Sequence, residues 1–346
     1  MSVAGLILSN LHDKELPALT SKRTMGAVPF GGRYRLVDFP LSAMVNAGLS
    51  RVFVIAHHNY QSLMEHIGSG KDWDMARHDG GIRIVPPYSA AYANPRENYG
   101  SRMQSLISVR GLLERIEEEN VLCCDCDVIG TPDFSAFIAA HKSSGLPFTE
   151  GVTEARDEKE RGLHIWIAKT SFLREILREA YLLGYTSFYG DVIRRAAAKG
   201  LVGNYHFAQS LYPISSLVDY YRLHMLLVGD EQTKRELLGC GERPVLTKTE
   251  NSPPVKYGKN ARVKNSLIAD GCVVEGTVIN SVLFRGVHVG AGCVVENSVV
   301  MARAKLSGNA RLNGAVLDKY VTLGGDVSLS GHPTLPFFVE EGRSIQ

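Results

Sequence analysis

The C-terminal third of the chain repeats a short pattern, and this repeat most narrows the folds that are open to it. The pattern is Asn, a small residue and two aliphatic residues, and successive copies start 15 to 17 residues apart, at Asn265, Asn280, Asn297 and Asn313. Three short strands joined by tight corners fill such a period, as in one coil of a parallel β-helix. Asn and Gly suit the corners because they tolerate positive φ angles. An antiparallel sandwich fits less well, since alternation is weak and the repeat is short.

The first two-thirds of the chain alternates apolar strands with amphipathic helices. This order predicts a mostly parallel sheet with helices on both faces. Ligands of such sheets bind at the carboxyl ends of the strands, so the loops after Leu8, Ala56 and Cys124 are the expected site. We expect strands at 3–8, 51–56, 82–85 and 121–124, and helices at 36–47, 60–67, 104–119 and 134–143.

Composition describes an ordinary globular protein. The 346 residues are 45% hydrophobic and 21% charged, with a formal net charge of +2. This balance gives no general electrostatic case for nucleic acid or an anionic membrane as partner. The apolar N-terminus is short and is expected to form a buried strand, so we expect a cytoplasmic protein. Cys123, Cys124 and Cys126 have no second ligand cluster at zinc spacing, and buried reduced thiols are expected there.

A motif at residues 27–42, AVPFGGRYRLVDFPLS, follows the segment LSNLHDKELPALT at 8–20. The pair resembles the opening of the sugar-1-phosphate nucleotidyltransferases, most closely the ADP-glucose pyrophosphorylases. In that family a loop of the form LAGGxGxRLxPLT binds the nucleoside triphosphate. Here the leucines and the threonine of that pattern are retained, at Leu8, Leu16, Leu19 and Thr20. The nucleotide-binding positions, however, hold Ser9, Asn10, Leu11, Asp13 and, in place of the arginine, Glu15.

These replacements oppose phosphate binding. A phosphate-binding loop needs backbone N–H groups that no Cβ shields, and three glycines have been lost. Two like charges about 4 Å apart, at an effective dielectric constant near 20, repel by roughly 4 kcal/mol, and Glu15 would stand in this relation to a phosphate. The sequence therefore predicts that the usual pose of ATP is lost.

The metal-binding carboxylates are also incomplete by this resemblance. Asp127 fills one family position for magnesium, and Asp133 fills a later one or caps the following helix. The second metal position is Ser187, whose neutral hydroxyl is a poor magnesium ligand. Asp191 remains, at a position with a supporting role in the family.

Two further family segments are altered. The nucleotide-contacting segment becomes residues 100–104, in which Gly100 and Ser101 persist and Met103 replaces the acid. The sugar-phosphate lysine has no secure counterpart, because residues 158–160, which include Lys159, only loosely match it. The surrounding segment 145–162 is expected to be a solvated connection.

The resemblance implies a fold and its boundaries. We expect a Rossmann-like nucleotidyltransferase domain over 1–228, a linker over 229–256, and a left-handed parallel β-helix of the hexapeptide-repeat type over 257–346. Four damaged parts of one site in an intact framework imply a regulatory subunit of glucose-1-phosphate adenylyltransferase. Such a subunit joins a catalytic subunit of the same family in a mixed oligomer, a tetramer, and no strongly bound cofactor is expected.

Alternatives stay open at this point. A competent enzyme would use Mg²⁺ on Asp127 and Asp191, with Lys14 or Arg23 replacing the lost arginine. An acyltransferase would use His288, since many acyltransferases have a similar β-helix. The resemblance also implies a site for a phosphorylated effector at the basic cluster, formed by Lys22, Arg23, Arg33 and Arg35.

Overall fold

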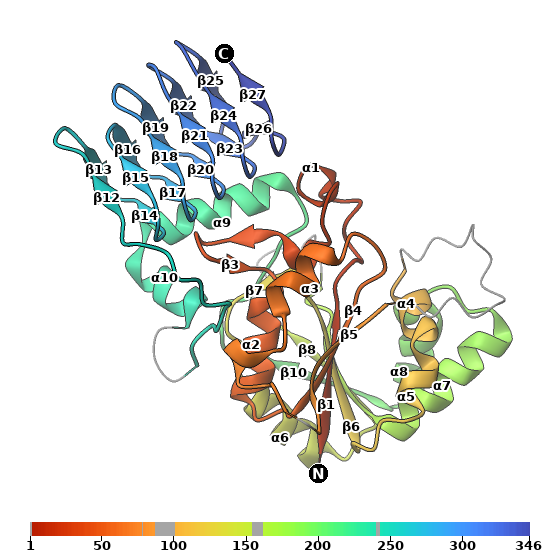
Figure 1. The fold of residues 1–346 in the computed structure, drawn as a ribbon. Coiled ribbons are helices and arrows are strands. Elements are labelled where there is room, and N and C mark those ends of the chain that lie inside the picture. Colours follow the sequence, from red (N-terminus) through yellow and green to blue (C-terminus); the bar gives the residue numbers. More distant parts are fainter. Residues whose placement is uncertain (1, 78, 87–100, 154–161, 240–242) are drawn as a thin grey trace.

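A seven-stranded sheet forms the centre of the first domain in the computed structural model, which describes residues 2–77, 79–86, 101–153, 162–239 and 243–346 (Figure 1). The strand order is β10-β8-β9-β6-β1-β4-β5. β9 is antiparallel to both neighbours, and the other neighbouring pairs are parallel, which confirms the mostly parallel sheet. The strands are β1 (Val3–Leu8), β4 (Arg51–Ile55), β5 (Gly81–Val85), β6 (Asn120–Asp125), β8 (Phe148–Val152), β9 (Ile165–Lys169) and β10 (Val202–His206).

Helices cover both faces of this sheet. Ile7 of β1 packs on one face with α2 (Asp38–Asn46), α3 (Gln61–Ile67) and α6 (Phe134–Ser144). Leu6 and Leu8 pack on the other face, where the helices are α4 (Arg102–Ser108), α5 (Arg110–Leu113), α7 (Thr170–Leu183) and the π-helix η3 (Phe188–Ile193), which continues as α8 (Arg194–Ala198). Burial on both faces explains why the central strands are continuous apolar runs. None of the helices in the described part of the chain is long and apolar enough to cross a membrane.

Two expected segments differ from the structure. The helix expected over 104–119 is divided into α4 and α5, and its second half does not form. Arg174 of α7 donates to the carbonyl oxygens of Leu113 (3.0 Å) and Ile116 (2.5 Å). These bonds satisfy backbone acceptors at and just after the C-terminus of α5, where the helix stops sooner than expected. The segment 145–162, expected as a solvated connection, includes β8, whose Phe148 is fully buried.

The second domain is a left-handed parallel β-helix with three sheets, as expected. Positive φ angles occur at Asn265 (46°), Asn280 (47°) and Asn297 (45°), where the repeat predicted corners. The amides of these residues and Asn313 also form a hydrogen-bonded ladder along the helix. The sheets contain β12 (Lys256–Tyr257), β15 (Val273–Val274), β18 (His288–Val289), β21 (Lys305–Leu306), β24 (Thr322–Leu323) and β27 (Ser344–Ile345); β13 (Arg262–Lys264), β16 (Thr277–Ile279), β19 (Val294–Glu296), β22 (Arg311–Asn313) and β25 (Ser328–Ser330); and β14 (Leu267–Ile268), β17 (Val282–Leu283), β20 (Val299–Val300), β23 (Ala315–Leu317) and β26 (Phe337–Val339).

The two domains share one apolar core. Helix α9 (Leu217–Gly229) lies between them (Figure 1), and Val282 and Val299 of the β-helix belong to the same buried cluster as the face of α2 and α6. Residues 229–256, predicted as the linker, include α10 (Glu231–Leu238) and then run along α2, where Leu246 N–H donates to Ser42 Oγ at 2.8 Å. The remaining elements are α1 (Pro17–Thr20), η1 (Met25–Ala27), β2 (Pro29–Phe30), β3 (Tyr34–Arg35), η2 (Lys71–Trp73), β7 (Val128–Ile129) and β11 (Tyr212–Pro213).

Candidate functional site

Three loops meet at the carboxyl edge of the sheet. β1 lies between β4 and β6, so the segments that follow these strands are neighbours. Asn10 Oδ1 accepts the backbone N–H of His57 at 2.7 Å, and His12 Nδ1 lies 2.8 Å from Asp127 Oδ2. The loops after Leu8, Ala56 and Cys124 therefore meet at one edge of the sheet.

Side chains of the loop after β1 fill the loop itself. Asn10 and Asp13 are only 5% and 6% exposed, and the Asn10 amide donates to the Asp13 carboxylate. The other Asp13 oxygen accepts the N–H of Met25 at 2.9 Å. Burial raises the pKa of Asp13, although the bonds from Asn10 and Met25 oppose that shift. No residue from 9 to 16, all of which the structure describes, has a positive φ angle, so the loop needs no glycine.

The other predicted residues of this loop face in different directions. Ser9 is fully buried, and its Oγ donates to Thr24 Oγ1 at 3.1 Å. Glu15 is exposed on the loop surface. Ser9 thus packs against the inner side of the loop, and Glu15 places its negative charge at the surface.

In the described part of the chain, one group of side chains has the spacing of metal ligands, and it consists of His12, Asp125 and Asp127. One ligand atom from each lies within 4.8 Å of the others. Asp127 was predicted, whereas His12 and Asp125 were missed. Asp125 pairs with Leu8 in the β1–β6 register, so Asp125 ends its strand beside the start of the loop that carries His12. The expected pairing of these two neighbouring strands was the signal from which Asp125 and His12 could have been placed together.

Arg102 neutralises Asp125. Its Nη1 and Nη2 donate to the two carboxylate oxygens of Asp125 at 2.5 and 2.7 Å. Burial by itself would lower the pKa of Arg102, but the Asp125 carboxylate raises it above the ordinary value. The guanidinium carbon also lies 5.6 Å from the ring centre of Tyr189. Arg102 was not among the predicted residues, because the resemblance at residues 100–104 pointed to the lost acid and not to the gained cation.

Asp191 and Ser187 serve a turn at the start of η3. Ser187 Oγ accepts the N–H of Gly190 at 2.9 Å, and Asp191 Oδ2 accepts the N–H groups of Ser187 (2.9 Å) and Thr186 (3.1 Å). These two N–H groups lower the pKa of Asp191. Among the described residues, Asp191 is not part of the metal-ligating group of Asp127.

Asp133 and Ser101 begin helices. Asp133 accepts the N–H of Ala136 at 3.0 Å, which confirms its interpretation as the residue that caps α6. Ser101 Oγ accepts the N–H of Gln104 at 3.2 Å at the start of α4. Gly100 and Lys159 lie outside the described residues.

The basic cluster divides between buried and exposed side chains. Arg23 is 2% exposed and forms ion pairs with Asp318 (2.9 Å) and Glu341. It therefore joins the domains and does not lie in the loop after β1 as a replacement for the family arginine. Lys22 is exposed, and its Nζ donates to the carbonyl oxygen of Glu341 at 3.4 Å.

Of the remaining members, Arg35 lies close to one further cation, Lys319. Arg35 donates to the carbonyl oxygen of Ser62 at 2.8 Å, and Arg33 lies over the ring of Tyr34 at 5.0 Å. Lys319 of the β-helix was not among the predicted residues. Burial lowers the pKa of Lys319 to about 8, and the positive charges of Arg35 and Arg23 contribute.

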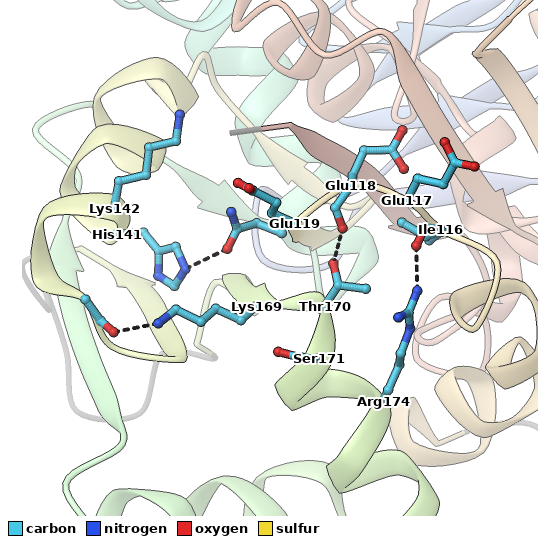
Figure 2. A pocket seen from close by; sticks show the side chains of 12 residues that line it. Ile116, Glu117, Glu118, Glu119, His141, Lys142, Lys169, Thr170, Ser171 and Arg174 are labelled. Atoms are coloured by element: carbon cyan, nitrogen blue, oxygen red, sulfur yellow. Dashed lines mark hydrogen bonds between the residues drawn. The ribbon is translucent and has the colours of Figure 1, made fainter.

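A separate pocket of about 450 Å³ opens at the opposite edge of the sheet (Figure 2). Two of its cations bind backbone: Lys169 donates to the carbonyl oxygen of Gly145 at 2.8 Å, and Arg174 donates to that of Ile116. Thr170 Oγ1 donates to the carbonyl oxygen of Glu118 at 2.6 Å. These contacts close helix and strand ends, and none of the predicted site residues lines this pocket.

Comparison with known proteins agrees with this architecture. Residues 4–164 match the Nucleotidyl transferase family, and residues 253–331 match the family described as GlmU-like, C-terminal hexapeptide. Glycogen biosynthesis protein GlgD of Bacillus subtilis (strain 168) is 31% identical over 98% of this chain and 95% of that protein. The GlgD of Geobacillus stearothermophilus is 34% identical over 84% of this chain and 82% of that protein. Glucose-1-phosphate adenylyltransferase of Clostridium perfringens (strain SM101 / Type A) is 29% identical over 88% of this chain and 85% of that protein. The chain therefore belongs to the family that contains the GlgD proteins and the glucose-1-phosphate adenylyltransferases.

Proposed function

We propose that this chain is a GlgD-type regulatory subunit of glucose-1-phosphate adenylyltransferase. The enzyme makes ADP-glucose and pyrophosphate from ATP and glucose 1-phosphate for glycogen biosynthesis in the cytoplasm. The chain would assemble with a catalytic GlgC-type subunit in a mixed tetramer. It would act by stabilising one state of its partner over another, and its own catalytic site would be degraded.

The loop after β1 is the observation that carries the proposal. Asn10 and Asp13 are buried in it and hold backbone N–H groups of His57 and Met25. A triphosphate in the usual pose would need this space and would meet the negative charges of Asp13 and Glu15. The hydroxyl of Ser187, which caps its own turn, adds a second deficit at the metal position.

The test measures ADP-glucose formation by the purified chain, by the catalytic subunit of the same genome, and by the two co-expressed. We expect no significant formation by the chain alone. We expect a stable mixed oligomer, seen by mass determination, with altered substrate or effector affinity. Robust synthesis by the chain alone, or a lack of association with the catalytic subunit, would refute the proposal.

The retained carboxylate of Asp127, which is buried and has the spacing of a metal ligand relative to His12 and Asp125, favours a second candidate. In it the chain is a competent enzyme that holds Mg²⁺ on Asp127, without Asp191, whose carboxylate accepts backbone N–H groups of its own turn. Asp127→Asn separates the two candidates, because it abolishes the chain's activity in a competent enzyme and leaves the activity of a mixed oligomer nearly unchanged in a regulator. Asp133→Asn, at the helix cap, is the matched control for the loss of one nearby carboxylate.

We also propose that a phosphorylated effector binds where the basic cluster meets the β-helix. Lys22, Arg33, Arg35 and Lys319 supply cations from both domains, and Arg23 fixes the domains relative to each other through Asp318. An anion bound there would contact both domains at once, and so its binding would depend on how they are packed.

A further inference from the structure

The side chains of Asp125, at the end of β6, and of Asp127, just after it, do not suit the magnesium ion that the family implies. Mg²⁺ favours an octahedral set of oxygens and keeps several waters. Here Asp127 lies 2.8 Å from a histidine nitrogen, and both oxygens of Asp125 are occupied by a guanidinium. The other family position is Ser187, whose hydroxyl accepts a backbone N–H.

We propose that Arg102, assisted by His12, takes the place of a divalent cation at this site, so that the chain carries its own cation and excludes metal. The inference rests on the proposed function, since a site that holds an internal cation leaves no place for a magnesium-bound triphosphate. The proposed function rests on the lost glycines of the loop after β1, whereas this inference assigns the exclusion of metal to Arg102 and His12.

Electrostatics explains why a cation is needed there. Asp125 and Asp127 are 1% and 0% exposed, and two buried carboxylates two positions apart are strongly unfavourable without compensation. The guanidinium fork matches both oxygens of Asp125, which is the strongest geometry for such a pair. Arg102 thereby supplies the positive charge that a metal ion would otherwise bring.

The surroundings hold Arg102 in this position. Arg102 is the first residue of α4, directly after the capping residue Ser101, so the helix start fixes its backbone. Its guanidinium lies over the ring of Tyr189, and that ring packs against His164 with 5.0 Å between ring centres. A metal ion approaching Asp127 would therefore meet a fixed positive charge that cannot move aside without losing these contacts.

The experiment titrates the purified full chain with Mn²⁺ and follows the free ion by electron paramagnetic resonance. We expect the natural protein to bind Mn²⁺ only weakly, with an affinity that Asp127→Asn does not change. Arg102→Met removes the charge and should tighten Mn²⁺ binding by about tenfold or more, because the like charge is gone. Arg102→Lys keeps a cation and should bind as weakly as the natural protein. In Arg102→Met with Asp127→Asn the gain should disappear.

Three results would overturn the inference. The first is Mn²⁺ binding by the natural protein that Asp127→Asn abolishes. The second is a folded Arg102→Met variant, judged by near-ultraviolet circular dichroism, that gains no Mn²⁺. The third is an equal gain in Arg102→Lys. If Arg102→Met does not fold, Arg102→Gln, which keeps hydrogen-bond donors without charge, takes its place with the same expected gain.

The proposed function and this inference fail separately. A chain that excludes Mn²⁺ but does not alter a catalytic partner refutes the regulatory role alone. A chain that alters its partner but binds Mn²⁺ through Asp127 refutes the internal cation alone.

Discussion

Arg23 Nη1 donates to Asp318 Oδ1 at 2.9 Å, and this ion pair joins the strand–helix domain to the β-helix. Both side chains are buried, and a second carboxylate, Glu341, accepts from Arg23 Nη2. A cation that the sequence grouped with a basic surface is therefore part of the domain interface.

Breaking this pair should destabilise the protein. We expect Asp318→Asn to lower the free energy of unfolding by about 3 kcal/mol, because it leaves Arg23 buried with reduced compensation. Urea unfolding followed by tryptophan fluorescence measures the change. Lys22→Met, one residue from Arg23 but exposed, is the control and should change the value by less than about 0.5 kcal/mol. An Asp318→Asn variant as stable as the natural protein would contradict the role of the pair.

Two substitutions at Asn280 separate the contribution of its side-chain hydrogen bonds from that of its positive φ angle. Asn280→Ala should cost about 2 kcal/mol, since it loses ladder hydrogen bonds and places a Cβ residue without a polar group at positive φ. Asn280→Gly should cost about 1 kcal/mol, because glycine accepts that φ angle. Thermal unfolding of both variants checks the order. Equal losses would show that the φ angle contributes nothing.

His224 should make stability depend on pH. It is fully buried between Gly31 N–H, which donates to Nε2 (3.1 Å), and the carbonyl oxygen of Tyr220, and burial lowers its pKa from 6.5 to about 4. The unfolded chain binds this proton more tightly, so its contribution is complete above pH 6.5 and is lost as the pH falls toward 4. At pH 5 the loss is about 2 kcal/mol.

The pH series of urea unfolding for His224→Gln tests this point. The variant should be less stable overall, and its unfolding free energy should fall less than that of the natural protein between pH 7 and pH 5. His206→Gln, at an exposed position, is the matched control and should keep the natural slope. An unchanged slope in His224→Gln would exclude His224 as the source.

The titration of Lys319 should make anion binding at the domain interface depend on pH. Its pKa of about 8 means that it carries its charge below pH 8 and loses it above. Binding of inorganic phosphate, measured by calorimetry, should weaken as the pH rises from 7 to 9. Lys319→Met should weaken binding at pH 7 by about tenfold and reduce the further loss above pH 8. Lys305→Met, exposed on the β-helix, should bind like the natural protein, and equal binding by Lys319→Met would contradict the proposal.

The thiols of Cys123, Cys124 and Cys126 should not react in the folded protein. All three are buried, and burial raises the pKa of each well above its ordinary value. A thiol reagent should therefore modify them only after denaturation, which mass spectrometry of digested protein can assign. Rapid labelling of any of the three in native protein would contradict their burial.

Much of the candidate site was open to prediction, and the rest was not. The loops after β1, β4 and β6 could be placed together because parallel strands end at a common edge. Asp133 could be given its capping role from its position before an apolar helix pattern. Arg102 could not be paired with Asp125, and Arg23 could not be paired with Asp318, because partners 23 and 295 positions apart leave no local pattern.

The amino-acid sequence by itself determined the two architectures and the loss of the glycine loop. Periodicity of apolar residues and small corner residues are local properties, and each repeat or strand carries its own signal. Only the tertiary structure decided which charges meet. Burial removes water from Asp125, Asp127 and Asp318, and a buried carboxylate must find compensation wherever the fold brings a cation, as it does with Arg102 and Arg23.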